Sequence, residues 1–355
     1  MSLESVYNLS MRTLVLGGTV FLSAAVAAEF ISRGHDVTCI ARGQSGVVPP
    51  GARLIVVNRA SGQSAYAQAK GDWDVVVDVS WEPSFVQDAL SALADRASHW
   101  TYVSSCSVYA DQGSGALDET ADVLSPLETG SPTSLETYGQ SKVACENFCL
   151  TALNSRLHIC RPGLIGGPGD PSDRFGYWPA RFARYPDDDV IVPNDAEAPT
   201  QTIDVRDLAD WIVTAAEAKI AGTMNAVGEQ RTLGEVIAAS QKVSGHKGNL
   251  VPVDEDWLLE HGVSGWAGPE SLPLWIPRAS GFDLLSRRSA ARAIGNGLSL
   301  RPLQDTLEAT LEFERRTGVR RERRAGLSQD NEYSLLTEWF TTRVAESRTR
   351  EYRSI

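Results

Sequence analysis

A tyrosine and a lysine stand four residues apart, as Tyr138 and Lys142, in the run TYGQSKVACE. A helix places positions i and i+4 on one face, so the phenol and the ammonium can point into the same cleft. A free phenol ionises near pH ~10, and a nearby cation stabilises its charged form. The spacing therefore predicts a tyrosine that acts as an acid or a base. An accidental surface pair is the alternative, although only five of the 33 basic residues are lysines.

A glycine turn near the start of the chain is the second chemical signal. Residues 13–16 form a short apolar run, GGTVFLS follows, and residues 24–33 are expected to form a helix. A strand, a glycine turn and a helix together present backbone N–H groups and a positive helix N-terminus to a pyrophosphate. The G-x-x-G-x-x-G spacing matches at Gly17 only, because Val20 and Ser23 occupy the other two positions. The turn alone is a weak signal.

Four segments occur in order along the first half of the chain: GGTVFLS, SSCSVY, YGQSK and RPGLIGGPGD. Over residues 12–320 the chain thereby resembles the extended short-chain dehydrogenase/reductase superfamily, of the NAD(P)-dependent epimerase/dehydratase type, with an atypical glycine turn. The resemblance implies an α/β fold: a Rossmann-type doubly wound parallel sheet with a smaller C-terminal substrate lobe. It also implies catalysis by Ser105, which would bind the substrate oxygen, Tyr138, which would transfer the proton, and Lys142, which would hold the nicotinamide ribose.

Further site residues follow from the resemblance and from the residue types near these segments. The expected cofactor contacts are Gly17, Gly18, Thr19, Phe21, Leu22, Arg42, Asn58, Ser80, Lys142, Pro162 and Leu164. The expected substrate contacts are Ser105, Ser107, Tyr138, Arg174, Tyr177 and Trp178. Arg181 could also bind an anionic substrate, or it could be a surface residue. For each aromatic residue, a role in the core is the alternative.

Cofactor choice can be read after the second expected strand, in HDVTCIARG. Members of the family that prefer NAD place an acidic residue there, whereas this chain has Ala41 and then Arg42. A guanidinium without a carboxylate suits a 2′-phosphate. We therefore expect NADP rather than NAD, with a solvated surface arginine as the alternative. Asn58 could face adenine or cap a turn.

The substrate is less well defined by the sequence. Sugar-nucleotide members have R-x-x-N-V-Y-G-P after the sixth strand, whereas this chain reads RPGLIGGP, with Leu164 in place of the asparagine. The first hypothesis is an NADP-dependent carbonyl reductase or alcohol dehydrogenase acting on a small metabolite. A sugar or nucleotide-sugar epimerase or dehydratase is the alternative enzyme. A sensor that binds a dinucleotide without catalysis, or an RNA-associated protein, is the alternative from another class.

Composition restricts the partners. A net charge of −12 disfavours a nucleic-acid surface, because phosphate binding requires clustered cations. The exception is an arginine-rich stretch at residues 315–324, expected to be a solvated connector paired with acids, with an anionic partner as the minority interpretation. Five cysteines without a C-x-x-C pair or a histidine cluster imply no metal site and suit a reducing cytoplasm. No apolar run is long enough to span a bilayer, and the resemblance makes a homodimer plausible.

Apolar runs alternate with helical patterns in the first half, which is typical of a doubly wound sheet. We expect strands at residues 13–16, 36–40, 54–57, 75–79, 100–103 and 157–160, and helices at 83–97, 137–153, 204–218 and 302–317. The expected dinucleotide-binding domain is 12–165, with 202–228 returning to it, and the substrate lobe is 166–201 and 229–330. Residues 1–11 would be a disordered or vector-derived extension or follow an upstream start codon, and 331–355 a C-terminal helix with one apolar face.

Overall fold

The computed structural model describes residues 10–113 and 115–353, so residues 1–9 of the expected extension lie outside the described residues. The chain divides into two compact units. The first contains the chain up to Ile165 together with Ile203–Gly228 and Arg288–Leu300. The second contains Gly166–Thr202, Glu229–Arg287 and the chain from Arg301 onward.

The first unit is built on a parallel sheet of seven strands in the order β10-β6-β5-β4-β1-β2-β3. The strands are β1 (Arg12–Leu16), β2 (Asp36–Ala41), β3 (Arg53–Val56), β4 (Trp73–Asp78), β5 (Ala97–Val103), β6 (Leu157–Pro162) and β10 (Gly222–Ala226). The strand order reverses between β1 and β4, which is the point where ligands bind in open α/β sheets. The doubly wound parallel sheet predicted from the sequence is confirmed, and β10 is an additional strand that the sequence did not reveal.

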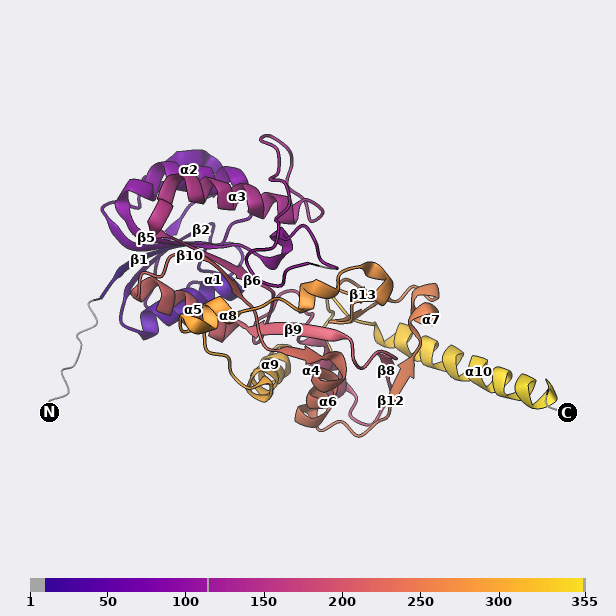
Figure 1. Cartoon of the computed structure of the whole chain (residues 1–355). Coiled ribbons are helices and arrows are strands. Elements are labelled where there is room, and N and C mark those ends of the chain that lie inside the picture. The colour runs from indigo at the N-terminus through magenta and orange to yellow at the C-terminus, as the bar shows by residue number, and fades with distance from the viewer. Residues whose placement is uncertain (1–9, 114, 354–355) are drawn as a thin grey trace, which may run out of the picture. The chain divides into compact units, whose positions relative to one another are not determined.

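Helices cover both faces of this sheet (Figure 1). They are α1 (Phe21–Ser32), α2 (Pro83–Leu93), α3 (Tyr138–Leu153), α5 (Val205–Glu217) and α8 (Ala291–Gly295), with the short 3₁₀ turns η1 (Arg59–Tyr66), η2 (Ala94–Arg96), η3 (Cys106–Val108) and η4 (Asn154–Arg156). α1 and α5 share one core layer, and α2 and α3 share the other. Strands buried on both faces explain the continuous apolar runs in the sequence.

Local signals account for several helix ends. Asp204 caps α5 by accepting a hydrogen bond from the backbone N–H of Arg206, as predicted. Pro83 stands at the start of α2, where its missing N–H costs no helical hydrogen bond. α1 begins at Phe21 rather than at residue 24, because the glycine turn is shorter than expected.

The second unit combines short strands with helices. Its strands are β7 (Leu164–Gly166, at the boundary), β8 (Val190–Pro193), β9 (Pro199–Asp204, at the boundary), β11 (Gln230–Thr232), β12 (Leu250–Val253), β13 (Ser264–Trp266) and β14 (Ser271–Pro273). Its helices are α4 (Tyr177–Arg184), α6 (Leu233–Ser244), α7 (Glu255–Glu260), α9 (Leu303–Thr317) and α10 (Gln329–Arg353), with the turns η5 (Arg278–Ser280) and η6 (Asp283–Ser286). α4 packs against α6 and α9.

Two features of the C-terminal half differ from the sequence expectation. The segment Arg288–Leu300 belongs to the first unit, where α8 packs against β10 and Arg288 donates to the carbonyl oxygens of Asp111 and Ala116. In α10, Leu335 and Trp339 are buried as an apolar face requires, but Phe340 is 47% exposed.

The described part of the chain contains no helix that is long and apolar enough to cross a membrane.

Candidate active site

The glycine turn after β1 is shaped by two residues with positive φ, Gly17 (φ 139°) and Gly18 (φ 96°). A side chain at Gly18 would also collide with Cys39, because its Cβ would lie 2.3 Å from the Cys39 sulfur. Ser23 takes the third glycine position without breaking the turn: it is buried beside Gly17, and its hydroxyl donates to the Val20 carbonyl oxygen at 2.8 Å. Among the described residues, no side chain caps the start of α1. Its first N–H groups can therefore bind an anion.

A cavity of about 370 Å³ opens beside this turn. It is lined by residues from the carboxyl ends of β1 to β4 and the turns that follow them, within residues 16–23, 40–45, 57–59 and 79–85. Five of the predicted cofactor residues line it: Gly17, Thr19, Arg42, Asn58 and Ser80. The other six do not: Gly18, Phe21, Leu22, Lys142, Pro162 and Leu164. Among the described residues in the lining, none is acidic.

The loop after β2 closes one wall of the cavity. Gly46 lies so near the glycine turn that a Cβ on it would stand 2.1 Å from the Thr19 carbonyl oxygen. The preceding residues Gln44 and Ser45 line the cavity. Asn58 accepts a hydrogen bond from the Ala60 N–H and thus caps the turn after β3, one of the two roles predicted for it.

Arg59, which lines the cavity, belongs to a buried ion pair. Arg59 donates to both carboxylate oxygens of Asp78 at 2.8 and 2.7 Å. Burial lowers the pKa of Arg59, but the charge of Asp78 and its hydrogen bonds raise it more, so the pKa of the guanidinium lies above its usual range. Asp78 is fully buried, and its carboxylate also accepts from the Ser80 N–H at 2.9 Å. Arg59 is therefore a structural cation at this edge.

Two serines stand at the end of β5. Ser105 caps the turn η3, since its hydroxyl accepts from the Ser107 N–H at 3.1 Å and donates to the Ser107 hydroxyl at 3.1 Å. Gly139, in the first turn of α3, lies against this turn: a Cβ there would be 2.3 Å from the Ser107 carbonyl oxygen. The close approach brings the start of α3, with Tyr138, against the turn that carries Ser105.

Lys142 is buried at the carboxyl ends of two strands. Its ammonium donates to the carbonyl oxygens of Val103 at 2.7 Å, Ser80 at 3.0 Å and Val79 at 3.4 Å. It also lies 5.9 Å from the centroid of the Tyr138 ring. The structure thus brings the predicted tyrosine and lysine to one edge of the sheet, as their i, i+4 spacing indicated.

A buried polar network supports the same edge and was not foreseen from the sequence. Glu146, one turn beyond Lys142 in α3, forms a two-pronged ion pair with Arg161 of β6 at 2.9 and 2.6 Å. Arg161 also donates to the Tyr109 hydroxyl, which donates to the Asn225 side chain of β10 at 2.6 Å. The only sequence signal was the i+4 spacing of Glu146 from Lys142. The network ties α3 to β6, β10 and the segment after Ser105.

The expected substrate residues of the second unit have other surroundings. Tyr177 and Trp178 are fully buried and pack edge to face, and the Trp178 N–H donates to the Pro273 carbonyl oxygen at 2.9 Å. Arg181 is buried and paired with Glu332 at 2.5 Å. These three residues belong to the core of the second unit, so the expectation that Tyr177 and Trp178 contact the substrate is corrected, and Arg181 is a buried ion-pair partner rather than a surface residue. Arg174 lies over the Trp266 ring at 4.9 Å.

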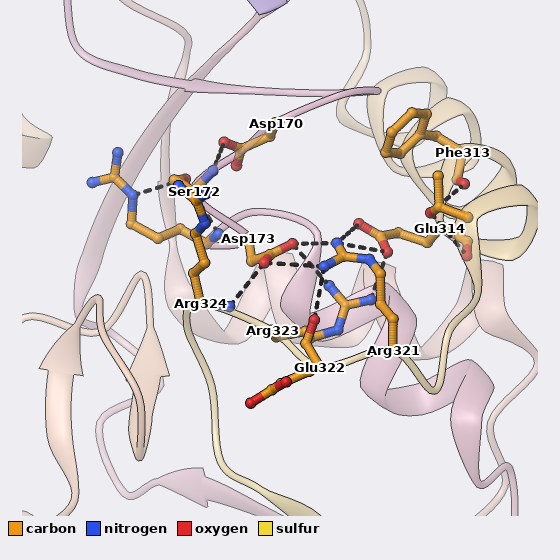
Figure 2. Close-up of polar contacts among 11 residues, drawn as sticks. Asp170, Ser172, Asp173, Phe313, Glu314, Arg321, Glu322, Arg323 and Arg324 are labelled. Atoms are coloured by element: carbon orange, nitrogen blue, oxygen red, sulfur yellow. Dashed lines mark hydrogen bonds and ion pairs between the residues drawn. The ribbon is translucent and has the colours of Figure 1, made fainter. Parts of the chain in front are cut away.

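The arginine-rich stretch is paired with acids, as predicted, but part of it is buried rather than solvated. Figure 2 shows Arg321 and Arg323 directed toward the carboxylates of Asp173 and Glu314. Arg321 donates to Asp173 at 3.1 Å and Arg323 donates to Glu314 at 2.5 Å. The Arg323 side chain is only 11% exposed. This cluster fastens the segment after α9 to the loop before α4.

The cysteines are unsuited to act as nucleophiles, and the described residues form no metal-binding group. All five cysteines are unpaired and buried, and burial raises the pKa of Cys106 to about 12 and that of Cys145 to about 11. A thiol held in this way is a poor nucleophile. Within residues 10–113 and 115–353, no three His, Cys, Asp or Glu side chains are grouped as a metal ion would require.

Comparison with known proteins gives a family match. Residues 13–227 match the family model described as the NAD dependent epimerase/dehydratase family. No curated protein sequence matches the chain.

Several solved structures are similar in fold. UDP-N-acetylglucosamine 4-epimerase from Bacillus cereus is 19% identical, with 86% of this chain and 97% of that chain covered and a TM-score of 0.62. UDP-glucuronic acid 4-epimerase from Bacillus cereus in complex with NAD is 19% identical, with 86% and 99% covered and a TM-score of 0.61. UDP-glucose 4-epimerase from Thermus thermophilus in complex with NAD is 18% identical, with 86% and 99% covered and a TM-score of 0.59. At these identities the likeness concerns the fold alone.

Proposed function

The chain belongs to the NAD-dependent epimerase/dehydratase family, and from this premise we propose that it acts on a sugar or nucleotide sugar by reversible hydride transfer, as an epimerase or dehydratase. It is an enzyme of the extended short-chain dehydrogenase/reductase type, as the sequence resemblance implied. The family match supports this reaction better than the carbonyl reductase that was the first hypothesis from the sequence.

One residue carries the proposal, because it belongs to both halves of the site. Ser80 lines the cavity beside the glycine turn, and its carbonyl oxygen accepts a hydrogen bond from the ammonium of Lys142 at 3.0 Å. The Lys142 ammonium is therefore bonded to a residue of the cavity lining, and the centroid of the Tyr138 ring lies 5.9 Å from that ammonium, which supports a shared site for a dinucleotide and these two side chains. The glycine turn, the uncapped start of α1 and the absence of acids among the described lining residues all suit a pyrophosphate.

In this proposal Ser105, Tyr138 and Lys142 each take part in the transfer of the substrate proton. When bound, the nicotinamide ring supplies the hydride acceptor and donor. Ser105 donates a hydrogen bond to the reacting oxygen of the substrate, and the Tyr138 phenol removes or returns the proton on that oxygen. Lys142 places a positive charge near the Tyr138 ring, where it stabilises negative charge that develops on the phenol oxygen.

We further propose that NADP is the preferred cofactor. Arg42 is exposed at the cavity, and no acid among the described residues pairs with it. A guanidinium there can bind a 2′-phosphate, and a charge-assisted contact of this kind contributes roughly 1.5–3 kcal/mol. NAD is the alternative, and it is the cofactor named for two of the similar structures.

Calorimetry with NADP⁺ and NAD⁺ tests the cofactor preference directly. NADP⁺ should bind at least about tenfold more tightly, as one charge-assisted contact provides. The variant Arg42→Ala should lose most of this difference while NAD⁺ affinity stays the same. Equal affinities of the unmutated protein for the two dinucleotides would refute the preference.

A carbonyl reductase remains the second candidate because of one residue. Leu164, at the position of the asparagine in the sugar-nucleotide pattern, is an apolar side chain with 6% exposure. It cannot donate a hydrogen bond to a diphosphate, and a buried phosphate without donors is strongly disfavoured. A substrate with a large apolar body would suit this position better.

A substrate panel separates the two reactions. The protein loaded with NADP⁺ or NAD⁺ is incubated with UDP-glucose and UDP-glucuronic acid, and epimerised or dehydrated products are measured by NMR. In parallel, NADPH oxidation is followed with an aromatic ketone such as acetophenone. Epimer or dehydration product supports the main proposal, whereas stoichiometric NADPH oxidation by the ketone alone supports the reductase. Tyr138→Phe is the control in both arms.

We also propose a homodimer, by analogy with extended members that associate through the helices equivalent to α2 and α3. Light scattering after size-exclusion chromatography measures the mass directly. A mass near 38.4 kDa, that of one chain, would refute the dimer.

A further inference from the structure

The turn that follows β4, residues 79–82, is held by two side chains beneath it. The Lys142 ammonium donates to the carbonyl oxygens of Val79 and Ser80. The Tyr102 hydroxyl donates to the same Ser80 oxygen at 2.9 Å, and Tyr102 is fully buried. This turn, called the Trp81 turn below, is thus bonded to the α3 side of the sheet through a buried cation and a buried phenol.

Two further hydrogen bonds hold the Trp81 turn, one inside the turn and one to the segment before α3. The Ser80 hydroxyl accepts from the Glu82 N–H at 3.1 Å. The Glu82 carboxylate in turn accepts from the Thr133 hydroxyl at 2.7 Å, in the segment that leads to α3. With both of its neighbours bonded in this way, the backbone of Trp81 has little freedom.

The indole of Trp81 packs against the ring of Tyr138. Their centroids are 5.5 Å apart and the ring planes are tilted by 56°. Tyr138 is the first residue of α3. Helical side chains lean toward the preceding residues, and before Tyr138 these form a single turn, in which the Tyr138 N–H donates to the Leu135 carbonyl oxygen at 3.4 Å. The Trp81 turn adds a ring contact to Tyr138 from another strand end.

We propose that Trp81 is a positioning residue for Tyr138: it holds the phenol so that its hydroxyl faces the substrate oxygen bound by Ser105. Lys142 then acts twice, once through its charge and once through the Trp81 turn that it anchors. This inference rests on the proposed function, because it assumes that Tyr138 transfers the proton.

Kinetics give the first arm of the test. Displacing a reacting group by about 1 Å costs on the order of 10²-fold in rate. Trp81→Ala should therefore lower kcat with UDP-glucose or acetophenone by about 10- to 100-fold, with KM and NADP⁺ affinity within about threefold. Trp81→Phe, which keeps a ring at the same place, should retain most of the rate. Trp257→Ala is the matched control, since it removes a tryptophan that stacks on His261 in the second unit.

Fluorine NMR gives a second arm that does not depend on activity. With 3-fluorotyrosine incorporated, the signal of Tyr138 is identified by its absence in Tyr138→Phe. Loss of the neighbouring indole in Trp81→Ala should shift that signal, whereas Trp257→Ala should leave it in place. An unmoved signal would overturn the packing. A shifted signal with undiminished kcat would overturn the positioning role. Full turnover by Tyr138→Phe would instead overturn the proposed function, and the catalytic part of this inference with it.

Discussion

Two buried histidines should make the first unit sensitive to mild acid. His158 of β6 is 0% and His99 of β5 is 1% exposed, and neither ring nitrogen of His158 has a hydrogen-bond partner among the described residues. Burial lowers the pKa of His158 to about 3, helped by the charge of His99, and burial with the charge of Lys219 lowers the pKa of His99 to about 4. Both rings are therefore neutral in the folded protein at about pH 5.

The size of the effect follows from proton linkage. In the unfolded chain a histidine titrates near pH ~6.5. Between that value and the lowered folded values, the unfolded state binds more protons, so stability falls as the pH falls. At about pH 5 each histidine lowers the free energy of unfolding by ~2 kcal/mol relative to about pH 7.5, or ~4 kcal/mol together. That is a large part of the ~5–15 kcal/mol typical of a folded protein.

Urea unfolding at about pH 7.5 and about pH 5 measures this loss, and His158→Leu isolates one histidine. The variant should be less stable at both pH values because of imperfect packing, but the difference between the two should shrink by ~2 kcal/mol. Thr13→Val is the matched control, because Thr13 is also fully buried on the sheet yet does not titrate. If His158→Leu kept the full pH difference, the reasoning about buried neutral histidines would be refuted.

Three further predictions concern the site. Tyr138→Phe should lower turnover by ~10²–10⁴-fold with NADP⁺ affinity within about twofold, and undiminished turnover would contradict its role. Gly46→Ala should weaken NADP⁺ binding about tenfold in calorimetry, because a Cβ there would lie 2.1 Å from a carbonyl oxygen of the glycine turn. Its control, Gly295→Ala, meets no atom within 4 Å and should bind normally. Asp78→Asn should lower the free energy of unfolding by about 3 to 5 kcal/mol in urea, because Arg59 stays buried without its counter-charge; unchanged stability would exclude this.

The strands of the central sheet were predictable where the strand sequence itself is rich in apolar residues. β1, β2 and β4 to β6 are largely buried and rich in apolar residues, although β5 and β6 also hold buried polar side chains, and their apolar positions stand out in the sequence. β10 did not, because its sequence GTMNA is short and its buried Asn225 is polar. Asn225 is satisfied by the Tyr109 hydroxyl, more than a hundred residues earlier in the chain. A strand whose polar residue depends on a distant partner gives little local pattern.

The placement of Tyr138 beside Lys142 was also predictable from a local signal. Tyr138 and Lys142 share a helix, so their spacing was informative before any fold was known. Trp81 approaches Tyr138 from another strand end, and sequence spacing does not show such a contact. The reverse error occurred at Tyr177 and Trp178. These two residues were expected to contact the substrate, but aromatic side chains also carry large apolar areas, and both pack in a core.

Lys142 has a structural role in addition to the catalytic role that we propose for it. Its ammonium has three donors, and three carbonyl oxygens from the ends of β4 and β5 converge on it. A compact ammonium can turn its three donors toward acceptors that do not lie in one plane, whereas the donors of an arginine guanidinium are confined to the plane of the group. In a chain where arginine is by far the more common cation, lysine at this position is thus explained by geometry as well as by charge. The residue that we propose assists the proton transfer also binds the ends of β4 and β5, so its removal should disturb the Trp81 turn and the proposed chemistry together.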